Sequence, residues 1–227
     1  MQGETILALS CGTLAMWVLI LIIFKWRGEK VWKSVPVAPI LTVTGTLGTY
    51  LWAWFESSAF GARSYYGAVF LVPVAFIWLS RLLKIPYKDL IDACAPAECI
   101  MLVLMKYMCL RDGCCGGRML YVSKEGTAVV FPSQIVELTV AGIIMLVLMV
   151  LARKEVNRGK VYAWYLVIYG AVRFALSFMR ESHDPFLAGL PIGSLWSVVA
   201  VFIGILWLGG YTVAIVKRRP KEDPADL

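Results

Sequence analysis

The residues best suited to do chemistry lie close together between Lys106 and Arg118. This stretch of thirteen residues holds four charged side chains, three cysteines and three glycines. Charged groups are costly at membrane depth, so their presence beside long apolar runs needs a reason. Cations next to glycines that let the backbone turn and approach a ligand are typical of a phosphate site. The stretch therefore indicates one edge of a polar site; the alternative is an interfacial loop that only anchors to lipid headgroups.

A second polar group follows in Phe131-Pro-Ser-Gln-Ile-Val-Glu137. Pro132 is expected to start a helix, because proline lacks an N–H that the first helical turn does not need. Gln134 then lies in the first turn, and Glu137 lies about one turn further along. Either Glu137 only benefits from the helix dipole, or it is an acid or base that faces a polar cavity.

The third polar group lies on the predicted helix that contains Tyr169. Arg173, Ser177 and Arg180 are spaced i, i+4 and i+7, so they share one helix face. An arginine this far inside an apolar run is expected to face a cavity or a carboxylate. Arg180 is near the expected end of the run, where ordinary interfacial charge is the alternative.

Two acidic residues precede the first group along the chain. Asp92 is near the start of an apolar run and is expected to cap that helix or to meet Lys88. Glu98 lies deeper, about 12 Å from Lys106 at 1.5 Å per residue. This is too far for a direct ion pair, so any cation for Glu98 would have to come from another helix.

The six cysteines do not predict a disulfide framework, which belongs to small, loop-rich secreted domains. Cys11, Cys94 and Cys99 are interpreted as small apolar helix residues. The remaining three have the spacing C-x4-C-C without a nearby histidine, so no metal site is expected. A redox pair of Cys114 with its neighbour is a weaker alternative, because adjacent cysteines form strained disulfides.

Seven apolar runs approach the roughly 20 residues that a membrane-spanning helix needs. They lie at about 5–24, 36–55, 66–83, 91–110, 130–152, 161–179 and 191–216. With 60% hydrophobic residues, the chain is expected to be an all-α polytopic membrane protein with seven transmembrane helices in one domain, 1–227. The first run has no basic n-region before it and no clear small-residue cleavage site, so a retained helix is expected rather than a signal peptide.

The net charge of +7 does not indicate nucleic-acid binding, because the cations alternate along the chain. Fifteen Lys and Arg residues lie in one set of connecting and terminal segments, and five lie in the other. Positive loops stay in the cytoplasm. The N-terminus and residues 106–118 are therefore expected outside, and the C-terminus in the cytoplasm, with its basic segment 217–219 near anionic lipid.

These polar groups, in this order, resemble the bacterial prolipoprotein diacylglyceryl transferases over roughly residues 64–205. Gly113-Cys-Cys-Gly-Gly117 fits a variant of the family signature, whose Arg and Asn fall on Lys106 and Cys109. The family pattern His-Pro-Ser/Thr-Gln-Leu-Tyr-Glu falls on 131–137, and Tyr-Gly-x-x-Arg-Phe-x-x-Glu-x-x-Arg falls on 169–180. The chain differs from the family at Tyr66 and Phe131 (His in the family), at Ser177 (Glu) and at Lys106 (Arg).

The resemblance implies a reaction in the bacterial plasma membrane without cofactor or metal. Diacylglycerol moves from phosphatidylglycerol, or another anionic phospholipid, to the lipobox cysteine thiol of a prolipoprotein signal peptide. It assigns catalysis to Glu137, Arg173 and Lys106. The substrate-binding residues that it implies are Tyr66, Cys109, Cys114, Gly117, Arg118, Gln134, Ser177 and Arg180. Two alternatives stay open: binding of lipid or peptide without turnover, and transfer to a different acceptor. The sole histidine, His183, is expected to be a solvated loop residue.

Overall fold

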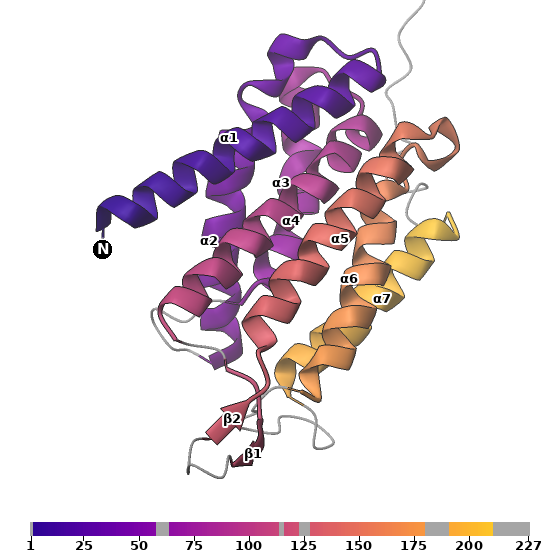
Figure 1. Ribbon diagram of the computed structural model, residues 1–227. Coiled ribbons are helices and arrows are strands. Elements are labelled where there is room, and N and C mark those ends of the chain that lie inside the picture. The colour runs from indigo at the N-terminus through magenta and orange to yellow at the C-terminus, as the bar shows by residue number, and fades with distance from the viewer. Residues whose placement is uncertain (1, 58–63, 114–115, 123–127, 180–190, 211–227) are drawn as a thin grey trace, which may run out of the picture.

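The computed structural model describes residues 2–57, 64–113, 116–122, 128–179 and 191–210. Within these ranges the chain forms seven α-helices and one short two-stranded hairpin (Figure 1). The helices are α1 (Gln2–Trp26), α2 (Val37–Ser57), α3 (Tyr66–Leu83), α4 (Tyr87–Arg111), α5 (Ser133–Arg153), α6 (Val161–Ser177) and α7 (Ile192–Leu208). The antiparallel strands are β1 (Met119–Val122) and β2 (Ala128–Val130), and the 3-10 turns are η1 (Val31–Ser34) and η2 (Glu155–Asn157).

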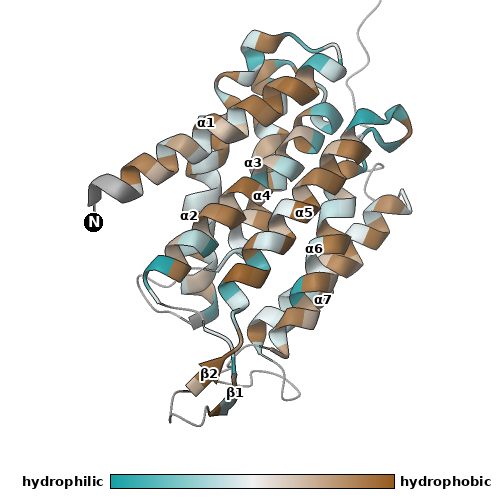
Figure 2. Ribbon diagram, viewed as in Figure 1, coloured by the Kyte–Doolittle hydropathy of each residue, from teal (hydrophilic) through white to brown (hydrophobic). Residues whose placement is uncertain are grey.

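Each of the seven predicted apolar runs corresponds to one helix, so the all-α prediction is confirmed. Among the described residues, four stretches are long and apolar enough to cross a membrane: Ile6–Trp26, Tyr66–Leu83, Tyr87–Arg111 and Ser133–Arg153. The helices α6 and α7 are also apolar but shorter. Figure 2 shows the hydrophobic residues along the middle of the helices and the hydrophilic ones near their ends. The number of spans and their orientation stay predictions.

Prolines mark the helix boundaries in the expected way. Pro132 and Pro191 directly precede α5 and α7, where the missing N–H costs little. Pro73 lies inside α3 and leaves the carbonyl of Val69, four residues earlier, without its helical donor. The hydroxyl of Tyr162 on α6 donates to that carbonyl at 2.9 Å. A side chain from a neighbouring helix thus supplies the hydrogen bond that the proline removes.

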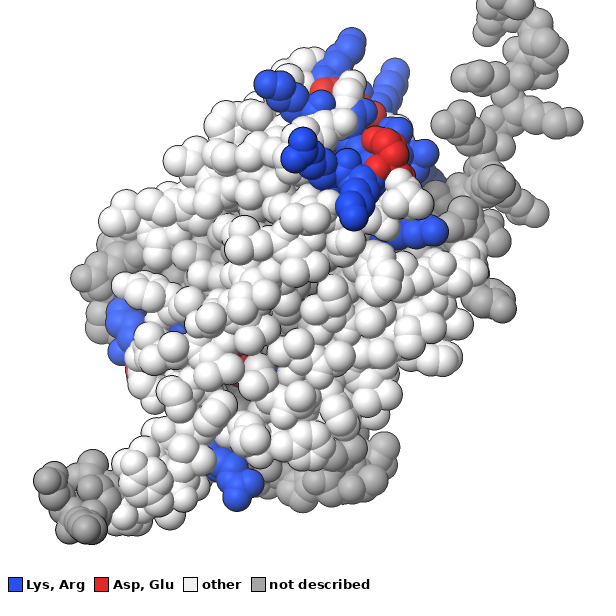
Figure 3. Space-filling view, turned by 45° about the vertical axis from the view of Figure 1, so that its right-hand side comes forward, with Lys and Arg blue, Asp and Glu red and all other residues white. Residues whose placement is uncertain are grey.

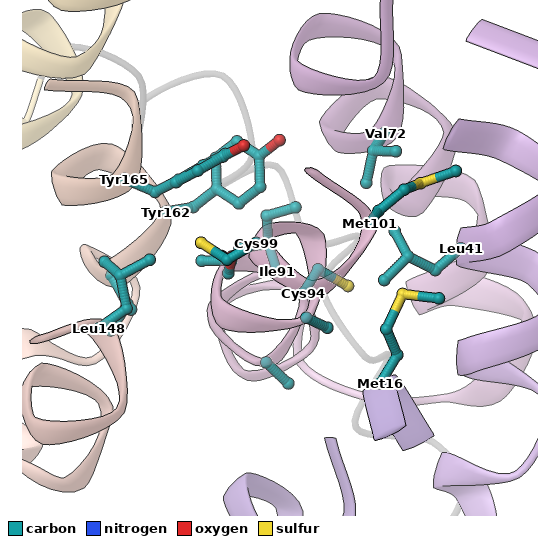
Figure 4. Close-up of a cluster of buried hydrophobic side chains, with 14 of the residues drawn as sticks. Met16, Leu41, Val72, Ile91, Cys94, Cys99, Met101, Leu148, Tyr162 and Tyr165 are labelled. Atoms are coloured by element: carbon teal, nitrogen blue, oxygen red, sulfur yellow. The ribbon is translucent and has the colours of Figure 1, made fainter. Parts of the chain in front are cut away.

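The helix α4 is the centre of the bundle and packs against α1, α3, α5 and α6. Its buried side chains include Cys94, Cys99 and Met101, which meet Met16, Leu41 and Tyr165 in the core (Figure 4). Cys94 and Cys99 are fully buried free thiols, as interpreted from the sequence, whereas Cys11 is exposed. The position of α4 in the middle explains how it can carry polar groups that reach several other helices.

Basic residues gather at one end of the molecule, where α1, α3 and α5 end (Figure 3). Ion pairs among five side chains join the elements there. Arg27 lies 3.7 Å from Asp92 and 3.0 Å from Glu155. Arg158 forms a bidentate salt bridge with Asp89, with N–O distances of 2.6 and 2.7 Å. These hydrogen bonds raise the pKa of Arg158 above its ordinary value.

Asp92 caps a different helix from the one that contains it. Its two carboxylate oxygens accept hydrogen bonds from the backbone N–H groups of Gly159 and Val161, at 2.6 and 2.9 Å. These groups begin α6, where the first turn has no internal acceptors. The expectation that Asp92 caps α4 or meets Lys88 is wrong, because Arg27 and α6 use both of its oxygens.

Candidate functional site

Three of the sequence-predicted residues meet at the opposite end of the bundle. The carboxylate of Glu137 on α5 forms ion pairs with Lys106 of α4 through one oxygen and with Arg173 of α6 through the other. The Lys106 Nζ lies 2.6 Å from Oε2, and the Arg173 Nη1 lies 3.5 Å from Oε1. The side chains of Lys106 and Glu137 are only 6% and 4% exposed, and that of Arg173 is 17% exposed. The resemblance names these three residues for catalysis, and the fold brings them into one cluster.

The location of Glu137 explains why a carboxylate is tolerated at this depth. Glu137 lies one turn inside α5, so the positive end of the helix dipole stabilises its charge. Two cations approach it, which compensates for the loss of hydration that burial causes. The cluster of Lys106, Glu137 and Arg173 therefore has a formal charge of +1, and it can attract an anion without a further cation.

Tyr66 is the next predicted residue, and it lies at the start of α3. Its side chain is buried, and its hydroxyl lies 2.6 Å from the Ser197 hydroxyl on α7. The Tyr66 ring stacks on Phe70 and lies beside Tyr169, one turn before Arg173 on α6. Tyr66 is thus held between three helices with its hydroxyl directed at α7.

Ser177 lies on the same face of α6 as Arg173, as the spacing predicted, and it is half-buried. Its hydroxyl donates to the Phe174 carbonyl at 2.6 Å and accepts a hydrogen bond of 2.8 Å from the Ser194 hydroxyl. Gly193, beside Ser194, lies close to the guanidinium of Arg173: a Cβ there would be 3.9 Å from Nη2. The first turn of α7 therefore faces the end of α6 that carries Arg173 and Ser177.

Sequence reasoning missed Ser194 and Ser197. Both are fully buried in α7, and both contact a predicted site residue. Their spacing of three places them on one helix face at the start of an otherwise apolar helix. That spacing is the sequence signal that would have found them.

The glycine-rich stretch connects α4 to the hairpin. Gly113 has φ +66°, the left-handed conformation that glycine adopts easily. The N–H of Gly117 donates to the Phe131 carbonyl at 3.1 Å, and an added Cβ would overlap that oxygen. The N–H of Arg118 donates to the Met179 carbonyl, while the Arg118 side chain is exposed. The backbone here ties the hairpin to the start of α5 and the end of α6.

The structure says less about the other predicted residues. Cys109 and Gln134 are half-buried, on α4 and α5 respectively. Cys114, Arg180 and His183 lie outside the described residues. Among the residues that the structure does describe, no three His, Cys, Asp or Glu side chains form a group that could hold a metal ion.

The arrangement is suited to chemistry on an anionic substrate. Arg173 and Lys106 can bind phosphate oxygens, and the guanidinium can do so through two hydrogen bonds. Glu137, which touches both cations, is placed to accept a proton once a substrate anion takes over part of their charge. Buried hydroxyls on α3, α6 and α7 can donate to or accept from a polar substrate group.

Comparisons with known proteins show the family of this chain. The sequence model of a family described as prolipoprotein diacylglyceryl transferase matches residues 7–209. A phosphatidylglycerol–prolipoprotein diacylglyceryl transferase of Geobacter sulfurreducens is 30% identical over 177 residues, which cover 72% of this chain and 65% of that protein. Proteins of the same description from Paracidovorax citrulli and Polaromonas naphthalenivorans are 28% and 29% identical, over 60% and 59% of their lengths. The chain thus spans slightly less than two thirds of the length of these relatives.

Proposed function

The chain belongs to the prolipoprotein diacylglyceryl transferase family, and from this premise we propose that it transfers diacylglycerol from phosphatidylglycerol to the lipobox cysteine thiol of a prolipoprotein. The observation that carries the proposal is the pair of cations, Lys106 and Arg173, on the single carboxylate of Glu137. The reaction needs a cationic group for the departing phosphate and an acceptor for the thiol proton. One cluster of three side chains supplies both.

In the proposed reaction the thiol sulfur attacks the glyceryl carbon that bears the phosphate. A C–S bond forms, the C–O bond to phosphate breaks, and glycerol phosphate leaves with the bonding electrons. Lys106 and Arg173 bind the phosphate and stabilise its growing charge. Glu137 takes the proton of the thiol, which is mostly protonated near neutral pH because its free pKa is about 8.5.

The remaining predicted residues have binding roles in this proposal. The hydroxyls of Tyr66 and Ser177, each paired with a serine of α7, bind the glycerol part of the lipid. Gly117 and Arg118 keep the hairpin beside the site through their backbone hydrogen bonds. Cys109, Cys114, Gln134 and Arg180 stay candidate substrate contacts, as the family signature implies.

The proposal includes a multi-pass location in the bacterial plasma membrane with the site on the outer side. It is supported by the gathering of basic residues at the other end of the bundle, since positive segments stay in the cytoplasm. Seven spans, an external N-terminus and a cytoplasmic C-terminus follow from this orientation. The site then faces the side on which secreted prolipoproteins emerge.

The test is expression in cells depleted of their own transferase, followed by detection of labelled lipid on a lipobox substrate. The full chain is expected to label the substrate, whereas Arg173→Ala is expected to abolish labelling. Arg111→Ala is the matched control, because Arg111 is a more exposed arginine at the same end that pairs with its neighbour Asp112. No labelling by the intact membrane-inserted chain would contradict the enzymatic proposal.

A second candidate function is binding of anionic lipid or lipobox peptide without turnover, or transfer to another acceptor. It is favoured by Tyr66 and Ser177, which stand where the family has His and Glu and whose hydroxyls are bonded to α7. Phosphatidylglycerol that copurifies with the protein while the substrate stays unlabelled would support binding without turnover.

A further inference from the structure

Glu98 is a fully buried carboxyl group that the proposed reaction does not use. It lies in the middle of α4, and its Oε1 is 2.9 Å from the hydroxyl of Tyr162 on α6. Its backbone carbonyl accepts a hydrogen bond of 2.8 Å from the hydroxyl of Tyr65, the residue directly before α3. Within the described part of the chain, no Lys or Arg lies within salt-bridge distance of Glu98, so its carboxyl group contacts a tyrosine hydroxyl and not a cation from another helix.

Counting the hydrogens of these groups indicates the form of Glu98. The Tyr162 hydroxyl has one hydrogen, and it lies 2.9 Å from two acceptors: Glu98 Oε1 and the Val69 carbonyl. That carbonyl has no helical donor, because the residue four positions later is Pro73. If Tyr162 donates its hydrogen to Oε1, the Val69 carbonyl is left without a donor; both contacts are satisfied only when Tyr162 donates to Val69 and a protonated Glu98 donates to the Tyr162 oxygen. A neutral acid also avoids the cost of an isolated buried charge.

The Glu98 contacts lie one layer below the candidate site. Glu98 and Tyr165 each precede the site residue of their own helix, Lys106 or Arg173, by eight residues, about 12 Å along the axis. Tyr165 joins the layer through its hydroxyl, 2.9 Å from that of Tyr65. Figure 4 shows the Tyr162 and Tyr165 rings beside the part of α4 that contains Cys99.

We infer that Glu98 is a positioning residue: as a neutral acid bonded to Tyr162, it fixes α4 against α6 and so sets how Lys106 and Arg173 meet across Glu137. Both helices run from the basic end of the bundle toward the site, so a shift of either helix at the Glu98 layer moves its cation by the same amount. A hydrogen bond depends on distance and angle, so it resists such a shift more strongly than apolar packing alone does. The activity readout of this inference rests on the function proposed above.

The test uses two substitutions of Glu98 in the full chain. Glu98→Gln keeps one acceptor and one donor and is the isostere of the neutral acid. Its kcat/KM for phosphatidylglycerol is expected within about threefold of the unmodified protein, with the same pH profile, since an amide replaces that hydrogen bond. Glu98→Leu keeps the volume but not the bond, and its kcat/KM is expected to fall by between about 10-fold and 100-fold, the effect of a displacement of roughly 1 Å.

Stability separates positioning from general damage. In Glu98→Leu the Tyr162 hydroxyl still donates to the Val69 carbonyl, so no buried donor is left unsatisfied and the loss of stability is small. The thermal unfolding midpoint of Glu98→Leu is therefore expected to stay close to that of the unmodified protein, although its transfer falls. Met101→Leu is the matched control, since it changes a buried α4 side chain outside the hydrogen-bonded layer; its transfer rate is expected to be unchanged.

A second variant tests the partner. Tyr162→Phe removes the contact with Glu98 and also the donor to the Val69 carbonyl, so the double variant is expected to lose no more transfer than Tyr162→Phe alone. Wild-type transfer by Glu98→Leu would overturn the inference. Loss of activity in Glu98→Gln equal to that in Glu98→Leu would overturn it too, because the group would then act through its charge or its proton.

Lipid binding keeps this test independent of turnover. If the unmodified protein does not transfer, the proposed function fails, and binding of phosphatidylglycerol by the purified variants then decides the inference. Weaker binding by Glu98→Leu, with unchanged binding by Glu98→Gln and Met101→Leu, would support positioning of the cations. Equal binding by all three variants and the unmodified protein would overturn it.

Discussion

Lys106 and Arg173 contact different oxygens of one carboxylate, that of Glu137, at 2.6 and 3.5 Å. The two cations come from α4 and α6, which are separated in sequence by the hairpin and α5. The negative charge of Glu137 offsets the repulsion between the two cations, and the cluster keeps a formal charge of +1. A substrate phosphate that enters would compete with Glu137 for both cations and would release the carboxylate for proton transfer.

Glu137→Gln is expected to lower both the stability of the protein and its transfer activity. The amide leaves two nearly buried cations without their counter-ion, and removing one partner of a buried pair typically destabilises a protein by about 3–5 kcal/mol. Transfer is expected to fall by about 100-fold or more, because the proton acceptor is lost. Lipid labelling and thermal unfolding in detergent check the two effects. A Glu137→Gln protein with full transfer activity would remove Glu137 from its role as the base.

Lys106→Arg is expected to preserve transfer or to increase it, whereas Lys106→Met is expected to abolish it. A guanidinium keeps the charge and adds a planar pair of donors that fits a phosphate better than an ammonium group does. The KM for phosphatidylglycerol in an in vitro transfer assay measures the effect. If Lys106→Met retains a normal KM and rate, Lys106 only neutralises Glu137.

Asp92→Asn is expected to destabilise the protein by about 1–3 kcal/mol without a specific loss of substrate affinity. The substitution weakens the bonds to Gly159 and Val161 at the start of α6 and leaves Arg27, which is nearly buried, without one of its carboxylates. The thermal midpoint and the KM for lipid are the two measurements. Asp112→Asn is the control, since that carboxylate is exposed; an equal shift in both variants would show that the cap is unimportant.

Gly117→Ala is expected to lower transfer more than Gly113→Ala does. A Cβ at residue 117 overlaps the Phe131 carbonyl, so the start of α5 and the hairpin must separate. At residue 113 a Cβ meets open space, and only the positive φ is unfavourable, by about 1–2 kcal/mol. Labelling rates at matched expression compare the two variants. Equal rates would mean that the contact of Gly117 with Phe131 does not affect the site.

Tyr66→Phe and Ser197→Ala are expected to have coupled effects on stability. Each removes one side of the 2.6 Å hydroxyl pair between α3 and α7, and such a bond contributes about 0.5–1.5 kcal/mol. The unfolding free energies of the two single variants and the double variant give the coupling energy. A coupling of zero would show that the Tyr66 hydroxyl is held by other groups.

The sequence by itself determined the elements of this protein. Apolar runs and prolines act locally, so the seven helices and their approximate ends followed from hydropathy and proline positions. The helical period likewise placed Arg173 and Ser177 on one face. The resemblance added the identity of the three clustered residues, because the family motifs keep their order along the chain.

Only the tertiary structure decided which side chains meet. Asp92 caps α6 instead of its own helix, Glu98 bonds to tyrosines instead of a cation, and Ser194 of α7 reaches Ser177. Each of these contacts depends on how two helices are rotated and shifted against each other. That relation is set by the packing of the whole bundle, and no local pattern of residues encodes it.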